Sequence, residues 1–239
     1  MLKNKKIIAI IPARGGSKGL PKKHIKILAG KPLIAWTIRQ VQKSKLIDKL
    51  IVNTDNKEIA KIARKYKVEV PFLRPKELAQ DNSSIYDVIF HTIDWFNKKG
   101  FNFDIIILLE PTSPLRKDED IDNAIRLFLK NIDKADSLVS VGEIQLESPF
   151  IAKKIERGYV KPFIKINKNF YQRQQLAKTY FPYGVIYLSK VKMLKKYKNF
   201  YQKKTIPYLI ERWQNYEIDD IFDFICVEAI LKSKLNKKQ

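Results

Sequence analysis

The sequence predicts an α/β fold with a doubly wound, mainly parallel sheet, and two features of the chain predict it. Short apolar runs alternate with longer stretches in which apolar residues recur every three or four positions, the spacing of one helix face. The first run, residues 6–12, has the sequence KIIAIIP, as in a strand buried on both faces. Strands that alternate with helices form parallel sheets, which bind ligands at the carboxyl ends of their strands.

The other elements follow in the same alternation. Residues 31–44 gather apolar side chains on one helical face, and residues 48–54 return as a strand that closes a β-α-β unit. Ser83 or Ser84 is the expected N-cap of a helix that continues to about residue 98. Further helices are predicted at 56–66, 118–131 and 219–235, and further strands at 68–73, 104–109, 136–141, 184–189 and 205–210.

The pattern changes between about residues 143 and 178. Short apolar stretches and a turn at Arg157-Gly158 replace the alternation of strand and helix. We therefore expect a β-rich insertion there, either a lid or a dimerisation arm. The 239 residues as a whole are expected to form a single domain that contains this insertion, because α/β domains reach roughly 250 residues.

Composition favours a folded protein of a reducing compartment, and a cytoplasmic location is expected. Hydrophobic residues make up 45% of the chain, enough to build a large interior. No apolar stretch approaches the roughly 18 residues of a membrane helix, and the run at 7–11 is too short for a signal sequence. The single cysteine, Cys226, has no partner for a disulfide or zinc site and is expected in the core. His91, inside a predicted helix, is expected to pack rather than react.

The net charge of +22 permits nucleic acid, an anionic membrane surface or an acidic small molecule as a partner. Only nine of the 47 basic residues are Arg, the forked donor that phosphate recognition favours. A lysine-rich solvated surface therefore explains the charge without nucleic acid. A basic nucleic-acid-binding protein stays as an alternative, whose binding would depend strongly on salt.

Residues 12–23, with the sequence PARGGSKGLPKK, follow the first strand directly and predict an anion-binding loop. Three glycines permit backbone conformations closed to other residues, so that N–H groups can turn toward an anion. Arg14, Lys18 and Lys23 supply positive charge, and we predict that the loop holds a triphosphate. The spacing matches neither the dinucleotide fingerprint GxGxxG nor the P-loop GxxxxGK[ST], which argues against both of those functions.

Two acidic residues just before the last predicted helix indicate a Mg²⁺ site. Glu217 and Asp219 alternate along an extended segment, so both carboxylates can face one side. Carboxylate oxygens are the ligands that suit Mg²⁺ bound to nucleotide phosphates. Helix capping is the alternative role for either residue, and it is the expected role of Asp220.

Several motifs resemble the CMP-sialic acid synthetases, or acylneuraminate cytidylyltransferases, in that family's order. They are IIPARGGSKGLPKK followed by KPLIAWTI, Thr54-Asp55, FLRPKELAQD, LLEPTSPLR, RQQ and YGVIY, and they span most of the chain. The resemblance implies a Rossmann-like nucleotidyltransferase fold and a homodimer joined through the insertion. It also implies N-acylneuraminate cytidylyltransferase activity, in which the anomeric hydroxyl of a nine-carbon α-keto acid sugar attacks the α-phosphate of CTP and expels pyrophosphate.

The resemblance implies a role for individual residues as well. Arg14, Lys23 and Asp219 would be catalytic, and Mg²⁺ would be held by Asp219 and Glu217. CTP would be bound by Ala13, Arg14, Gly15, Gly16, Ser17, Lys23, Arg74, Ser83 and Ser84. The sugar would be bound by Glu110, Arg173, Gln174, Gln175, Tyr187, Phe200 and Tyr201.

Four positions depart from the family pattern: Glu110 stands for a usual Gln, Glu217 for a usual Asp, and His24 and Tyr183 for a frequent Asn. A carboxylate at position 110 would accept hydrogen bonds from the sugar acid or repel it instead of donating to it. The sugar is therefore left open between sialic acid, a legionaminic-type acid and the eight-carbon acid of lipopolysaccharide core. A scaffold that kept the fold and lost activity is a further alternative.

Overall fold

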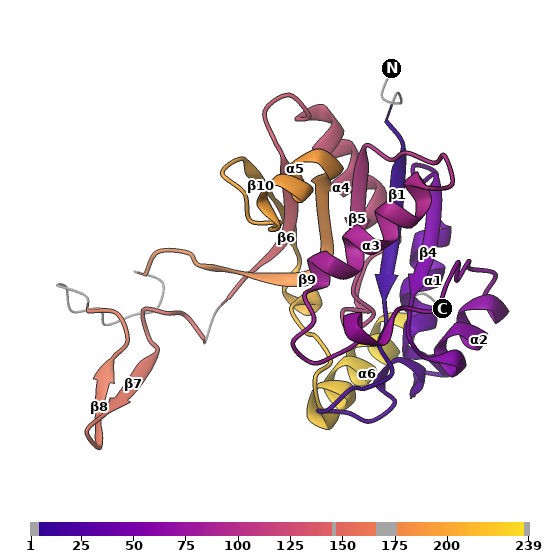
Figure 1. Cartoon of the computed structure of the whole chain (residues 1–239). Coiled ribbons are helices and arrows are strands. Elements are labelled where there is room, and N and C mark those ends of the chain that lie inside the picture. The colour runs from indigo at the N-terminus through magenta and orange to yellow at the C-terminus, as the bar shows by residue number, and fades with distance from the viewer. Residues whose placement is uncertain (1–4, 145–146, 166–175, 237–239) are drawn as a thin grey trace.

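The central sheet has six strands in the order β10-β6-β9-β5-β1-β4 (Figure 1). The computed structural model describes residues 5–144, 147–165 and 176–236. β1 is parallel to β4 and β5, and β6 is parallel to β10, whereas β9 runs antiparallel to both β5 and β6. The mainly parallel sheet predicted from the sequence is confirmed. The strands are β1 (Ile7–Pro12), β4 (Lys49–Asn53), β5 (Ile105–Leu108), β6 (Ser137–Glu143), β9 (Tyr180–Lys190) and β10 (Thr205–Ile210).

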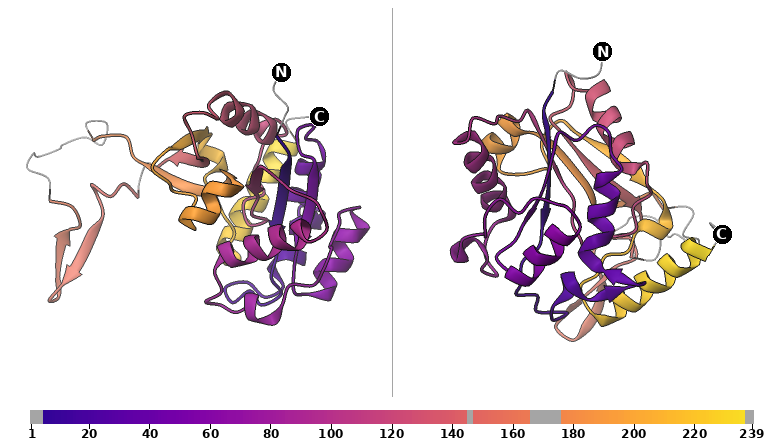
Figure 2. Two further views of the ribbon diagram at one scale, coloured as in Figure 1. Left: turned by 45° about the horizontal axis from the view of Figure 1, so that its top comes forward. Right: turned by 90° about the vertical axis from the view of Figure 1, so that its right-hand side faces the viewer.

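Helices cover both faces of this sheet (Figure 2). Alternate residues of β1 point to opposite faces, so Ile7, Ala9 and Ile11 pack under α1, α2 and α4. Ile8 and Ile10 pack against α3 and Leu194 of α5 on the other face. All five predicted helices are present, and the helices are α1 (Leu33–Gln42), α2 (Lys57–Lys65), α3 (Ile85–Asn97), α4 (Asp120–Lys130), α5 (Val191–Tyr197) and α6 (Ile221–Asn236).

The closing helix α6 lies beyond the carboxyl end of β1 and forms a third apolar cluster. Phe224, Val227 and Leu231 of this helix pack with Leu28 and Leu33. A small hairpin of β2 (Ile27–Leu28) and β3 (Lys31–Pro32) lies between the first loop and α1. The packing brings the end of the chain against the loop that follows β1.

Residues 153–162 form a separate hairpin, β7 (Lys153–Glu156) and β8 (Tyr159–Pro162). Its turn is at Arg157 and Gly158, as predicted, and both have positive φ, the conformation of tight hairpin turns. The hairpin stands away from the body (Figures 1 and 2). Ile155, Tyr159 and Val160 are each more than 70% exposed there.

Two predictions from the sequence differ from the structure, and one helix was not predicted. Residues 68–73 make two single bridges, at Glu69 and Leu73, instead of a strand, because Pro71 between them has no N–H to donate. The short helix α5 was not predicted. Cys226 is exposed rather than in the core, because it lies on a different side of α6 from Phe224, Val227 and Leu231, which pack into the third apolar cluster. No helix in the described part of the chain is long and apolar enough to cross a membrane.

Candidate functional site

A pocket of about 230 Å³ lies where β1 and β5 end, the edge at which ligands were expected. Four of the predicted site residues line it: Arg14, Arg74, Ser83 and Glu110. His24, one of the four departures from the family pattern, lines it too.

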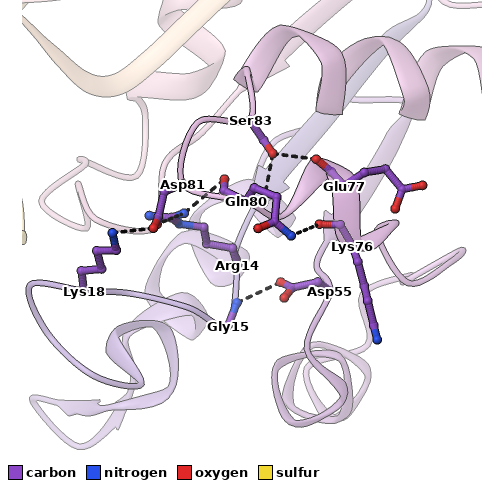
Figure 3. Close-up of polar contacts among 9 residues, drawn as sticks. All are labelled: Arg14, Gly15, Lys18, Asp55, Lys76, Glu77, Gln80, Asp81 and Ser83. Carbon is purple, nitrogen blue, oxygen red and sulfur yellow. Dashed lines mark hydrogen bonds and ion pairs between the residues drawn. The ribbon is translucent and has the colours of Figure 1, made fainter.

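The loop after β1 places two cations against one carboxylate (Figure 3). A guanidinium nitrogen of Arg14 lies 2.8 Å from one oxygen of Asp81, and the ammonium of Lys18 lies 2.6 Å from the other. Hydrogen bonds from Lys18 and Arg14 hold the pKa of Asp81 below its usual value. The two oxygens of the Asp81 carboxylate contact Arg14 and Lys18 in the way that two oxygens of a phosphate would. Asp81 was not predicted as a site residue, although it ends the FLRPKELAQD motif.

Gly15 and Gly19 of this loop permit the close approach of other segments, and neither has a positive φ. Among the described glycines only Gly30, Gly100 and Gly158 have positive φ, so the loop glycines do not use here the backbone freedom that the sequence suggested. A Cβ at Gly15 would lie 2.7 Å from the Asn56 amide nitrogen, and a Cβ at Gly19 would meet the backbone oxygen of Asp219.

The backbone N–H groups of three other predicted residues of the loop already have hydrogen-bond acceptors in the structure. The Gly15 N–H donates to Asp55 at 2.9 Å, so it already has an anionic partner. The N–H of the buried Ala13 donates to the Asn53 carbonyl at 3.0 Å, and that of Ser17 to the Gly15 carbonyl at 3.2 Å. No side chain crowds Gly16, where an added Cβ would meet open space.

Lys23 joins the loop to the acidic segment near the other end of the chain. Its ammonium donates to the Ile218 carbonyl at 2.7 Å and to the Asp219 carboxylate at 3.0 Å. The Lys23 side chain is 11% exposed, whereas that of Asp219 is 86% exposed. Two of the three predicted catalytic residues are therefore in direct contact, and the acid is accessible to a ligand.

The structure separates the roles of the neighbouring acids. Asp220 accepts from the N–H groups of Phe222 and Asp223 and caps α6, as predicted. Glu217 is not a cap: one of its oxygens accepts from the Ser113 hydroxyl at 2.6 Å and from the Gly184 N–H. It joins the loop after β5 to β9.

The donor set fits the predicted Mg²⁺. No cluster of three or more His, Cys, Asp or Glu side chains suited to a metal occurs among the described residues. Mg²⁺ in nucleotide sites is usually held by one or two carboxylates together with substrate phosphates, and Asp219 and Glu217 are donors of that kind. The assignment of both residues to the metal stays a prediction.

Glu110 and Glu217 converge on Gly184, the glycine of the YGVIY motif. A Cβ at Gly184 would lie 2.5 Å from a Glu110 oxygen and 2.9 Å from a Glu217 oxygen, so a larger residue there would displace the ends of both carboxylate side chains. Burial, and then the Glu217 carboxylate, raises the pKa of Glu110 to about 7, while Arg116 acts in the opposite direction. A carboxyl with that pKa is protonated in about half of the molecules at neutral pH, and a protonated acid donates a hydrogen bond as an amide does.

Arg116 is a structural residue that the sequence analysis did not single out. Its buried guanidinium donates to the carbonyls of Glu110 at 2.8 Å and Gly184 at 3.0 Å, and to the Thr37 hydroxyl at 3.0 Å. These bonds fix the loop after β5 relative to β9 and α1. Burial lowers the pKa of Arg116 only to about 10, so the guanidinium is charged at neutral pH.

Arg74 lines the pocket, and its guanidinium is fixed by hydrogen bonds to Asn53. Two of its nitrogens donate to the side-chain and backbone oxygens of Asn53, at 2.6 and 2.9 Å. Burial lowers the pKa of Arg74 to about 10. The side chain is therefore a fixed cation in the wall.

The two serines have different tasks. Ser84 is the N-cap of α3, and its hydroxyl accepts from the Tyr86 N–H at 3.2 Å. Ser83 lines the pocket, and its hydroxyl accepts from Gln80 and donates to the Glu77 carbonyl (Figure 3). A ligand role for Ser84 stays a prediction, with its hydroxyl already engaged.

Aromatic residues predicted for the sugar side cluster beside Glu110. The Tyr187 ring lies 5.3 Å from Phe200 and 6.5 Å from Tyr201, centre to centre. Burial and the Glu110 carboxylate raise the pKa of Tyr187. Phe200 is only 2% exposed and belongs to the core under α3, whereas Tyr201 is 48% exposed. Arg173, Gln174 and Gln175 lie outside the described residues.

A second, larger cavity of about 680 Å³ lies between α1 and the last turns of α6. Trp36 and Trp213 are among its lining residues, and none of the predicted site residues lines it. Tyr183, the remaining departure, packs edge-on against Phe181 at 5.0 Å and lines neither cavity.

Known proteins are similar to this chain in sequence and in fold. The chain is 35% identical over 229 residues to the CMP-N,N'-diacetyllegionaminic acid synthase of Legionella pneumophila, a match that covers 95% of this chain and 97% of that protein. It is 32% identical to the N-acylneuraminate cytidylyltransferase of Escherichia coli O18:K1:H7 over 98% of its own length and 54% of the relative, so it spans about half of that protein.

The solved structure of CMP:2-keto-3-deoxy-manno-octonic acid synthetase complexed with CTP superposes with a TM-score of 0.72. The match covers 96% of this chain and 99% of the other at 16% identity, and it shows a common fold. The family model described as cytidylyltransferase matches residues 8–234. The chain therefore belongs to the cytidylyltransferase family, in the group of the CMP-sialic acid synthetases.

Proposed function

We propose that this protein transfers CMP from CTP to an acidic nonulosonic sugar and releases pyrophosphate. The observation that carries the proposal is the contact of Lys23 with Asp219 at the edge of the sheet where Arg14 and Lys18 also lie. A triphosphate needs cations along its length, and a transferase that expels pyrophosphate needs them at the leaving group.

Each part of the site has a task in this reaction. Arg14, Lys18 and Lys23 bind the triphosphate and neutralise charge that builds on the departing pyrophosphate. The triphosphate takes the place of the Asp81 carboxylate on the two cations that it now holds. Asp219 and Glu217 would hold Mg²⁺, which supplies further positive charge on the phosphates when bound. Arg116 keeps Glu110 and Gly184 in register on the acceptor side.

N-acylneuraminic acid is the acceptor that the sequence analysis favoured, and a legionaminic-type acid is the second candidate. The second is favoured by Glu110, which stands where the sialic acid enzymes usually have Gln. The relative from Legionella pneumophila, whose name gives N,N'-diacetyllegionaminic acid, also matches over nearly its whole length. With its pKa near 7, Glu110 can donate to the acceptor when protonated and accept from it when ionised.

The acceptor is identified by incubating the protein with CTP, Mg²⁺ and one sugar acid at a time, with the CMP-sugar detected by mass spectrometry. The panel contains N-acetylneuraminic, N,N'-diacetyllegionaminic, pseudaminic and the eight-carbon keto acid. A product from one or more nine-carbon acids supports the proposal. A product from the eight-carbon acid alone would contradict it.

The proposal also covers the oligomeric state of the protein and its location in the cell. The β7–β8 hairpin is proposed to pack against a second copy of the chain, because an isolated two-stranded hairpin with exposed apolar side chains is marginally stable in water. A cytoplasmic location is proposed because the reaction consumes CTP. Nucleic-acid binding is not favoured, because the cytidylyltransferase family model matches residues 8–234.

A further inference from the structure

Two cations of the anion-binding loop, Arg14 and Lys18, are held by a carboxylate of the protein itself. One oxygen of Asp81 lies 2.8 Å from a guanidinium nitrogen of Arg14, and the other lies 2.6 Å from the Lys18 ammonium (Figure 3). Asp81 lines the pocket together with Arg14, so the carboxylate belongs to the site. It therefore occupies positions at which a phosphate would make charge-assisted hydrogen bonds.

Other anion-binding groups of the loop also have carboxylate partners. The Gly15 N–H donates to Asp55 at 2.9 Å, and the Lys23 ammonium donates to Asp219 at 3.0 Å. Asp219 has an expected task in the reaction, because it would hold the metal beside the phosphates. Asp81 has no such task, although it is the acid that holds two of the cations. Its contacts therefore need an explanation of their own.

The contacts of Asp81 are weak enough for a ligand to replace them. The side chains of Arg14, Asp81 and Lys18 are 32%, 50% and 78% exposed. An ion pair at such exposure shifts an equilibrium by a factor of roughly 1.5 to 5. A ligand with several negative charges can therefore displace the carboxylate. A phosphate that bound without displacing it would lie beside a like charge, which weakens binding as well.

We propose that Asp81 is an internal competitor of the pyrophosphate part of CTP, which weakens binding at Arg14 and Lys18 and promotes the release of pyrophosphate after transfer. The inference rests on the proposed function and deepens it, since it concerns the same two cations. Because Asp81 is tethered to the site, it is present at an effective concentration with which a free ligand has to compete. When pyrophosphate dissociates, the carboxylate returns to both cations and opposes rebinding.

Substitutions at Asp81 and at a neighbouring acid test this role. Asp81→Asn removes the charge and keeps the shape, and Asp81→Ala removes both contacts. Glu77→Gln is the matched control, because it makes the same charge change in the same segment while the Glu77 carboxylate points away from Arg14 and Lys18 (Figure 3). Affinities for inorganic pyrophosphate and CTP are measured by calorimetry at a fixed Mg²⁺ concentration without sugar acid, so that no turnover is required.

Both Asp81 variants are expected to bind pyrophosphate and CTP about two- to tenfold more tightly than the wild type, because the cations no longer have to be freed first. The inhibition constant of pyrophosphate during turnover should fall by the same factor. Glu77→Gln should keep the wild-type affinities. In a Lys18→Met background Asp81→Ala should gain less affinity than in the wild type, because one of the two contacts is already absent.

A carboxylate that merely positions Arg14 for a phosphate would give the opposite result. Both Asp81 variants would then bind pyrophosphate and CTP more weakly than the wild type, since the guanidinium would lose its support. The melting temperature separates either effect from a general loss of structure. It should change by no more than about 2 °C in the ligand-free Asp81 variants, because the two ion pairs are exposed.

The failure of this inference and the failure of the proposed function give different results. If the wild type binds both ligands and the Asp81 variants bind them equally or more weakly, the inference is overturned while the proposed function stands. An equal gain in Glu77→Gln also overturns it, because the effect is then one of net charge. If the Asp81 variants bind more tightly but no sugar acid yields a CMP-sugar, the proposed function fails and the competition by Asp81 stands. If the wild type binds neither ligand, both fail.

Discussion

The Lys23 ammonium lies 3.0 Å from the Asp219 carboxylate, although 196 positions separate the two residues in the chain. The Ile218 carbonyl holds the same ammonium, and the missing side chain of Gly19 lets the backbone of Asp219 approach the loop. The cations of the loop and the acid that would carry the metal are therefore brought together before any ligand binds. This contact gives the first prediction.

Asp219→Ala should reduce turnover roughly 100-fold, because it removes the accessible carboxylate beside the phosphates. It should also raise the Mg²⁺ concentration needed for half-maximal rate, and EDTA should abolish activity of the wild type. Asp220→Ala is the matched control: it removes the cap of α6, and should lower the melting temperature by about 2–4 °C with turnover nearly unchanged. Similar turnover for the two variants would remove Asp219 from the metal assignment.

Arg14→Ala should lower kcat/KM for CTP roughly 10- to 100-fold, since a charge-assisted contact with the triphosphate is lost. Steady-state pyrophosphate release at varied CTP measures the effect. Cys226→Ala, a change at an exposed residue of α6, should stay within about twofold of wild type. An Arg14→Ala enzyme as fast as the Cys226→Ala enzyme would exclude a phosphate contact at Arg14.

Glu110 should make stability depend on pH in a defined window. Because its pKa is raised from 4.5 to about 7, the folded protein keeps a proton that the unfolded chain has already lost. This group therefore lowers stability progressively as the pH rises from about 4.5 to about 7, and not further above that. Glu110→Gln mimics the protonated acid. Its melting temperature should equal that of wild type near pH 4.5 and exceed it by a few degrees at pH 8. An equal gap at both values of pH would contradict the shift.

The β7–β8 hairpin should mediate self-association. Ile155 and Val160 are opposite one another across its two strands and are 81% and 71% exposed. Ile155→Lys with Val160→Glu keeps a favourable cross-strand pair but makes the surface charged. Light scattering should give a dimer for the wild type and a monomer for the double variant. Lys154→Ala, a change at the neighbouring position of the same strand, should leave the protein dimeric. A monomeric wild-type protein would contradict the proposed role of the hairpin in dimerisation.

The sequence was sufficient for most of the fold because the apolar patterns were long and regular. The strand at Ile7–Pro12 and the helix at Ile85–Asn97 are both present within two residues of their predicted ends. The antiparallel direction of β9 was not predictable, because a strand pattern contains no direction. The single bridges at 68–73 depend on how that segment lies against β4, which is a tertiary property.

For the site, the sequence located the loop cations and the acidic segment but not their pairing. Asp81 was not predicted as a site residue because its contacts with Arg14 and Lys18 join residues more than 60 positions apart in the chain. The loop glycines were predicted for backbone freedom, whereas in the structure Gly15 and Gly19 leave room for Asn56 and Asp219. Phe200 was predicted to face the sugar, but its 2% exposure makes it core packing. Close approach and burial arise only when distant segments pack.

The most direct test of the central claim is pyrophosphate release with Mg²⁺ and N,N'-diacetyllegionaminic or N-acetylneuraminic acid, using CTP and, in parallel, ATP, GTP and UTP. Release with CTP that requires both the sugar acid and Mg²⁺, and that falls sharply in Arg14→Ala and Asp219→Ala, is the predicted result. Equal release from all four nucleotides, or none from CTP with either acid while the protein is folded, would contradict it.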